Sequence, residues 1–130
     1  LVLPGDNPDV GSLLMTHENG AVSTLSTSYA SASEYYLFNV YGKRVSAYYN
    51  LFDGLRALDQ GDTDHHAVEV DKADTLAEQL IEWADAANGI GEIEVGGESA
   101  TESLAVVKAG IKSACEGRHV EVAEILASRE

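Results

Sequence analysis

The clearest group of potentially reactive side chains in this sequence is Asp62 with His65 and His66. Asp62 and His66 are four residues apart, a spacing that on a helix would place a carboxylate and an imidazole on one face. The local sequence instead predicts a turn followed by a strand, where successive side chains point to opposite sides, so His65 and His66 should diverge. We therefore interpret this group as a polar surface loop rather than a catalytic or metal site.

Other residues with catalytic potential have structural explanations. Cys115 is the single cysteine and has neither a partner cysteine nor a matching histidine motif. His17 lies beside an Asn-Gly pair, and His119 follows a predicted helix end, where an imidazole interacts favourably with the helix dipole. Trp83 lies on an apolar helix stripe and is predicted to be in the core. No catalytic residue or metal site is expected in this chain.

The glycines do not predict a nucleotide site. Gly89 and Gly91 follow a predicted helix, whereas the dinucleotide fingerprint follows a strand, and Glu94 stands where that pattern needs its third glycine. We expect no cofactor to bind to this chain itself.

Composition limits the partners of the chain. Its 22 acidic and 8 basic residues give a formal charge of −14, which repels nucleic acid and anionic lipid. No apolar run approaches the roughly 20 residues of a membrane span. A salt-adapted protein would also be rich in acidic residues. The single cysteine is consistent with a reducing compartment, so a cytoplasmic location is expected.

Strand patterns dominate the first half of the chain. An Asn19-Gly20 hairpin turn would pair Leu14 with Leu25 and Thr16 with Ser23. A second turn at Gly42-Lys43 would pair Tyr41 with Arg44 and Val40 with Val45. Further strands are predicted around Asp53-Gly54 and over His65 to Val70.

Helical periodicity follows. Asp71 or Asp74 is predicted to cap a helix that ends at Gly89, and a Ser99/Glu102 capping box is predicted to begin a second helix that ends at Gly117. A brief strand at Val120 and Val122 should close the chain. Strands followed by helices indicate an α+β fold with an open, mainly antiparallel sheet and two main helices packed on one face. Residues 1–9 are expected to form an N-terminal linker, and residues 10–130 are expected to form a single domain.

The two helices leave the other sheet face available for oligomerisation. Half of its predicted side chains are aromatic or apolar and half form hydrogen bonds, a mixture that favours an interface. The expected interface residues are Leu37, Asn39, Tyr41, Arg44, Ser46 and Tyr48. A polar segment at the sheet end is the candidate substrate-binding region, with Tyr29, Ser31, Ser33, Glu34 and Tyr35.

The segments YYLFNVYGKRVSAYY, Trp83 to Gly89, Val95 to Glu98 and Val106 to Val122 together resemble the second domain of the glucose-fructose oxidoreductase/inositol dehydrogenase (Gfo/Idh/MocA) family. The resemblance covers nearly the whole chain from Val10. It implies an NAD- or NADP-dependent parent oxidoreductase acting on a sugar, polyol or related substrate. It also implies a dimer or tetramer formed through the bare side of the sheet.

The family's Rossmann domain, its Glu-Lys-Pro motif and its catalytic helix have no counterpart in this sequence, so the chain alone is expected to be inactive. We expect it to be a piece of a longer dehydrogenase or a processed chain. The alternative is a self-standing protein-binding or assembly module that has no enzymatic partner domain.

Overall fold

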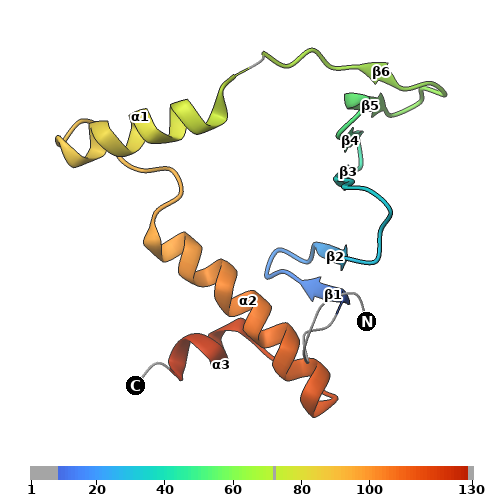
Figure 1. The fold of residues 1–130 in the computed structure, drawn as a ribbon. Helices are drawn as coiled ribbons and strands as arrows, with labels where there is room; N and C mark the ends of the chain where they lie inside the picture. Colours follow the sequence, from blue (N-terminus) through green and yellow to red (C-terminus); the bar gives the residue numbers. More distant parts are fainter. Residues whose placement is uncertain (1–8, 72, 129–130) are drawn as a thin grey trace. The chain divides into compact units, whose positions relative to one another are not determined.

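A computed structural model describes residues 9–71 and 73–128, which form two compact units, Leu1–Lys72 and Ala73–Glu130 (Figure 1). The first unit contains β1 (Val10–Thr16), β2 (Val22–Ser28), β3 (Leu37–Tyr41), β4 (Val45–Asn50), β5 (Gly54–Asp59) and β6 (His66–Ala67). The second contains α1 (Thr75–Ala87), α2 (Gly97–Glu116) and α3 (Val122–Ala127). The predicted α+β class with open antiparallel strands is confirmed. None of the described helices is long and apolar enough to cross a membrane.

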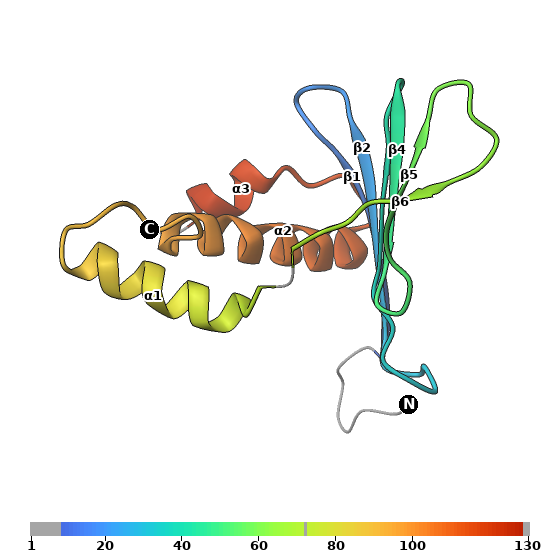
Figure 2. The same cartoon turned by 90° about the horizontal axis from the view of Figure 1, so that it is seen from above.

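The strands form two sheets rather than one. β1 pairs only with β2, and the other sheet has the order β3-β4-β5-β6 with every neighbouring pair antiparallel. The β1–β2 and β5–β6 hairpins can be followed in Figure 2. The predicted linker over residues 1–9 lies almost wholly outside the described residues; of it, Asp9 extends the first hairpin by accepting a backbone hydrogen bond from Tyr29 at 2.8 Å.

The predicted register of the first hairpin is wrong by one residue. Gly20 has a φ of 83°, whereas Asn19 does not enter the left-handed region, so the loop contains three residues and His17 donates to Ala21 at 2.9 Å. Leu25 therefore pairs with Leu13 instead of Leu14. A slip of one residue exchanges the faces of a strand, which puts Leu13 and Leu25 on the same face.

The predicted register of the second hairpin is wrong by two residues. Lys43 and Arg44 form the turn, Gly42 donates to Val45 at 3.0 Å, and Tyr41 pairs with Ser46 instead of Arg44. A slip of two residues leaves every strand side chain on its predicted face. The residues expected at the interface therefore share one face, except Arg44, which lies in the turn.

Two further strands are shorter than predicted. Leu51 to Asp53 form a turn, because the Asn50 Oδ1 atom accepts the backbone N–H groups of Phe52 and Asp53 at 2.9 and 2.8 Å, and β5 begins only at Gly54. The strand predicted over His65 to Val70 is limited to His66 and Ala67.

In the helical unit, the predicted cap at Asp74 and the predicted helix end at Gly117 are correct, and the predicted capping box is wrong. The Asp74 carboxylate accepts the Ala77 N–H at 3.1 Å and begins α1. The predicted capping box is wrong, since Ala100 donates to Gly96 at 3.1 Å and the helix begins two residues before Ser99. Gly117 ends α2 with a φ of 64°, as predicted.

The predicted final strand is wrong, because Val122 begins the helix α3. Its half-buried apolar residues Val122, Ile125 and Leu126 have helical spacing, and α3 folds back along α2 (Figure 2).

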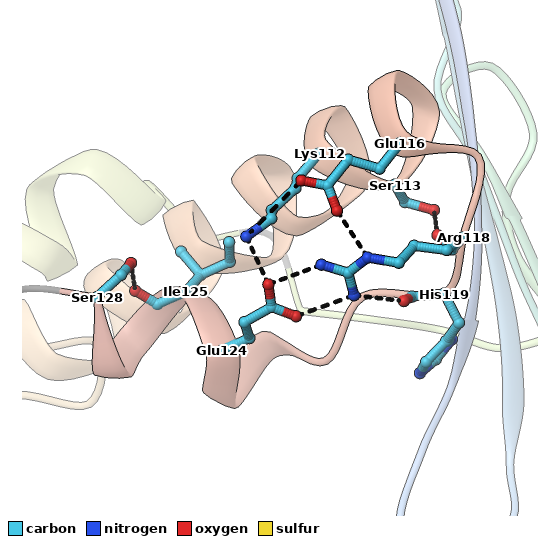
Figure 3. Close-up of polar contacts among 8 residues, drawn as sticks. All are labelled: Lys112, Ser113, Glu116, Arg118, His119, Glu124, Ile125 and Ser128. Atoms are coloured by element: carbon cyan, nitrogen blue, oxygen red, sulfur yellow. Dashed lines mark hydrogen bonds and ion pairs between the residues drawn. The ribbon is translucent and has the colours of Figure 1, made fainter.

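A group of ion pairs joins α3 to the end of α2 (Figure 3). Lys112 and Arg118 bind Glu124 at 2.5 and 2.8 Å, and Arg118 binds Glu116 at 2.6 Å. Hydrogen bonds from Arg118 and then Lys112 lower the pKa of Glu124 to about 2. These ion pairs link α3 to the end of α2.

Candidate functional site

The predicted substrate-binding segment connects β2 to β3 and contains no strand. All five predicted residues are exposed: Tyr29, Ser31, Ser33, Glu34 and Tyr35. The Ser31 hydroxyl donates to the Ser33 carbonyl at 2.8 Å, and the Tyr35 ring stacks on Phe52 with centroids 6.0 Å apart. The segment therefore presents hydroxyl groups and an aromatic face to solvent, an arrangement suited to hydrogen bonding with a polar ligand.

Tyr36, beside this segment, was not predicted to contribute to a site. Its hydroxyl donates to Glu34 at 2.9 Å, and this hydrogen bond, together with the negative charge of Glu34, raises the pKa of Tyr36. The phenol is therefore protonated at neutral pH and serves as a hydrogen-bond donor rather than a base. The sequence spacing of Tyr36 and Glu34 could have predicted this contact, since residues two apart lie on the same side of an extended chain.

The register of β3 and β4 collects five of the six predicted interface residues on one face. We call this set the tyrosine face; it consists of Leu37, Asn39, Tyr41, Ser46 and Tyr48. Leu37 and Tyr41 are 59% and 73% exposed, while Asn39 and Tyr48 are half-buried. Arg44 lies outside this set, in the turn.

Aromatic contacts order the tyrosine face. The Tyr41 and Tyr48 rings meet edge to face with centroids 5.7 Å apart, and His65 packs on Tyr48 at 4.7 Å in the same geometry. Asn39 donates to the Tyr41 hydroxyl at 3.2 Å, while its buried Oδ1 atom lacks a hydrogen-bond partner among the described residues. The contact of His65 required the β5–β6 loop to fold back, so strand periodicity alone did not reveal it.

His66 points away from this aromatic group, as the alternation predicted. Its Nδ1 atom lies 3.7 Å from an Asp59 oxygen, and Asp59, Asp62 and His66 can each offer a ligand atom within 4.8 Å of the others. Carboxylate oxygens and imidazole nitrogens are both ligands for divalent cations. All three side chains are exposed, which agrees with a polar surface loop. Asp59 was missed because the hairpin pairing, rather than sequence spacing, brings it close.

A groove of about 660 Å³ lies beside α1 in the helical unit. Its lining residues are Thr75, Leu76, Glu78, Gln79, Glu82, Trp83, Glu94 and Val95. Glu82 accepts the backbone N–H of Glu94, which holds the segment after α1 against the helix. Trp83 is 54% exposed, although the apolar stripe predicted it to be in the core. The groove is acidic and partly aromatic, and the sequence interpretation did not identify it.

Comparison with known proteins gives one informative similarity. No protein-family model and no curated protein matches the chain. The chain is similar to the crystal structure of a putative NADPH-dependent oxidoreductase from Desulfitobacterium hafniense DCB-2, with a TM-score of 0.82 and 30% sequence identity. The similarity covers 97% of this chain but only 41% of that protein. The chain is thus related in fold and sequence to one part of an oxidoreductase.

Proposed function

We propose that this chain is the C-terminal domain of an NAD(P)-dependent oxidoreductase that acts on a sugar, polyol or related substrate. The observation that carries the proposal is the similarity to the Desulfitobacterium protein over 97% of this chain at 30% identity, with more than half of that protein unmatched. We place the cofactor domain of the parent protein in the part that corresponds to the unmatched length. NADPH is the preferred candidate cofactor because the similar protein is a putative NADPH-dependent oxidoreductase.

The role of this domain is to provide one wall of the substrate pocket. The segment from Tyr29 to Tyr36 supplies neutral hydroxyl groups, a carboxylate at Glu34 and an exposed aromatic ring at Tyr35. Hydroxyl and carboxylate groups hydrogen-bond well to polyols, and aromatic rings pack on the apolar faces of sugars. The catalytic lysine and the cofactor come from the rest of the parent protein.

The tyrosine face is proposed as the oligomer interface. It combines exposed Leu37 and Tyr41 with the half-buried amide of Asn39, and it lacks charged side chains. Aromatic residues are enriched and charged residues are depleted in the cores of protein interfaces. A dimer or tetramer formed through this face would also cover the exposed aromatic edge of Tyr41.

The test begins with the coding frame upstream of Leu1. A strand-Gly-x-Gly-x-x-Gly-helix unit followed by Glu-Lys-Pro is expected there, and the full-length protein should oxidise or reduce NADP(H) with a member of a sugar and polyol panel. The 130-residue chain alone should bind neither NADPH nor NADH. A gene without a dinucleotide-binding unit would refute the proposal and favour the self-standing binding module.

A further inference from the structure

β3 is an edge strand, and its outer side has an unusual composition. β4 pairs along one side of it, and no strand of the described chain pairs along the other. Its sequence is Leu-Phe-Asn-Val-Tyr, without a charge, a proline or a bulge. Proteins normally protect exposed edges with those features, because a flat apolar edge readily pairs with another strand. The composition of β3 is therefore typical of a strand that has neighbours on both sides.

The hydrogen-bonding pattern identifies the unpaired backbone groups. Gly42 donates to Val45 at 3.0 Å and Leu51 donates to Tyr36 at 3.2 Å, so even-numbered residues of β3 direct their backbone groups toward β4. The N–H and C=O groups of Leu37, Asn39 and Tyr41 consequently point outward. An added strand would find three consecutive sites for ladder hydrogen bonds on this edge.

β2 has a similar free edge in the other sheet. His17 donates to Ala21 at 2.9 Å and Tyr29 donates to Asp9 at 2.8 Å, so odd-numbered residues of β2 face β1. The outward backbone groups belong to Val22, Thr24, Ser26 and Ser28. This strand also has no charge or proline, and a two-stranded sheet is only marginally stable by itself. Within the described chain, β1 (Val-Gly-Ser-Leu-Leu-Met-Thr) is also neutral and has an unpaired outer edge, but β2 is the strand that connects directly to β3.

The connection between these two edges is long enough to pass around an intervening strand. Residues 29–36 join β2 to β3 and reach roughly 26 Å when extended. Two strands that flank a third lie only about 9.6 Å apart. β2 and β3 are neighbours in sequence, yet they do not pair with each other.

We propose that one strand from a part of the parent protein outside these 130 residues inserts between β2 and β3 and joins the two sheets into one. This inference rests on the proposed function, because the Desulfitobacterium protein extends well beyond the 41% of its length that matches this chain. The inserted strand is predominantly apolar. Its side chains pack beside Phe38 and Val40, which are 68% and 50% exposed.

Residue-resolved amide hydrogen exchange in the full-length protein tests the proposal. The amides of Leu37, Asn39 and Tyr41 should exchange roughly 100-fold more slowly than unprotected amides. The amides of Phe38 and Val40, which point toward β4, should be protected in the same way. Phe38 and Val40 serve as internal controls in the same strand. Fast exchange at the three outward amides while the controls are protected would overturn the proposal.

A pair of proline variants tests whether the inserted strand bridges both sheets. Asn39→Pro removes an outward N–H and leaves the β3–β4 ladder intact, so in the full-length protein it should speed exchange at Thr24 and Ser26 by about 10-fold or more. Thr16→Pro, which removes an outward N–H on the far side of the β1–β2 hairpin, is the matched control. Unchanged exchange at Thr24 and Ser26 in Asn39→Pro would exclude a bridging strand.

Three results separate this inference from its alternatives. Outward protection of β3 that disappears on dilution to monomer would assign the edge to a second copy of this chain and refute the proposal. Protection in a full-length monomer that lacks a dinucleotide-binding unit would support the inserted strand while the oxidoreductase proposal fails. An active NADPH-dependent enzyme with rapidly exchanging outward amides in β3 would support the oxidoreductase proposal and refute the inserted strand.

Discussion

Gly42 shows how a single atom can fix a hairpin. A Cβ atom built on this residue would lie 2.6 Å from the backbone oxygen of Val45, the same oxygen that accepts the Gly42 N–H. Backbone atoms cannot move aside as flexible side chains can, so the turn at Lys43 and Arg44 requires glycine before it. The residue is needed for close approach rather than for a left-handed conformation.

Gly42→Ala should therefore destabilise the sheet by about 1–3 kcal/mol, the usual range for overpacking. Urea unfolding followed by circular dichroism measures the change. Gly97→Ala is the matched control, because an added Cβ there meets no atom within 4 Å and Gly97 lies at the start of α2. Equal stability of the two variants would show that the close contact at Gly42 relaxes without cost.

Glu124 gives the ion-pair group of the helical unit a defined pH dependence. Its pKa is lowered from 4.5 to about 2, first by the hydrogen bond from Arg118 and then by that from Lys112. A depressed carboxylate pKa stabilises the folded state above the unfolded pKa, and this stabilisation is lost as the pH falls from about 4.5 toward 2. Glu124→Gln should lower stability at neutral pH and match the wild type near pH 2.

Glu121→Gln is the control for that measurement, since the Glu121 carboxylate lies 2.9 Å from the exposed His119 and outside the ion-pair group around Glu124. Urea midpoints of both variants across the acid range provide the comparison. Solvent exposure of the group makes the expected effect modest. A pH-independent difference between Glu124→Gln and the wild type would assign the loss to packing rather than charge.

At the scale of the element, α1 depends on its N-terminal cap. Asp74 accepts the Ala77 N–H at 3.1 Å, and α1 has no fully buried residue to stabilise it. Asp74→Ala should reduce stability by about 1 kcal/mol, whereas Asp74→Asn retains an accepting oxygen and should remain near the wild type. Thermal unfolding monitored by helical circular dichroism tests the pair. Similar losses in both variants would point to the charge of Asp74 instead of its hydrogen bond.

The tyrosine face belongs to the scale of the whole molecule, because its proposed role is assembly. Replacing Tyr41 and Tyr48 together with alanine should convert an oligomer of the full-length protein to monomer or insoluble protein, since the edge-to-face pair would be lost. Sedimentation velocity provides the measurement. Tyr29→Ala removes an exposed tyrosine outside the face and is the control. An unchanged sedimentation profile of the double variant would refute this interface.

The charge of −14 should make the stability of the whole chain depend on salt. Like charges repel in the compact state, and screening shortens from about 30 Å at 0.01 M salt to about 3 Å at 1 M. The melting temperature should therefore rise with added NaCl, and KCl should give the same curve if screening is the cause. A falling melting temperature would show that the attractive ion pairs around Glu124 outweigh the general repulsion.

The sequence by itself determined the α+β class, the Asp74 cap, the end of α2 at Gly117 and the two faces of the β3–β4 hairpin. These features depend on local periodicity and on single backbone preferences, which nearby residues specify. The side chains of β3 and β4 lie on their predicted faces because the predicted register was wrong by two residues, and side chains two residues apart share a face. The one-residue error at Asn19-Gly20 exchanged the face of Leu14, since the type of turn depends on a conformational choice that several sequences permit.

Only the tertiary structure decided which distant residues meet. It placed His65 on Tyr48 and Asp59 beside His66, because the β5–β6 hairpin brings those pairs together. It also paired Glu124 of α3 with Lys112 and Arg118, at the position where a strand was predicted. The division into two sheets has the same cause, since strand pairing requires hydrogen-bond partners that local sequence patterns do not identify.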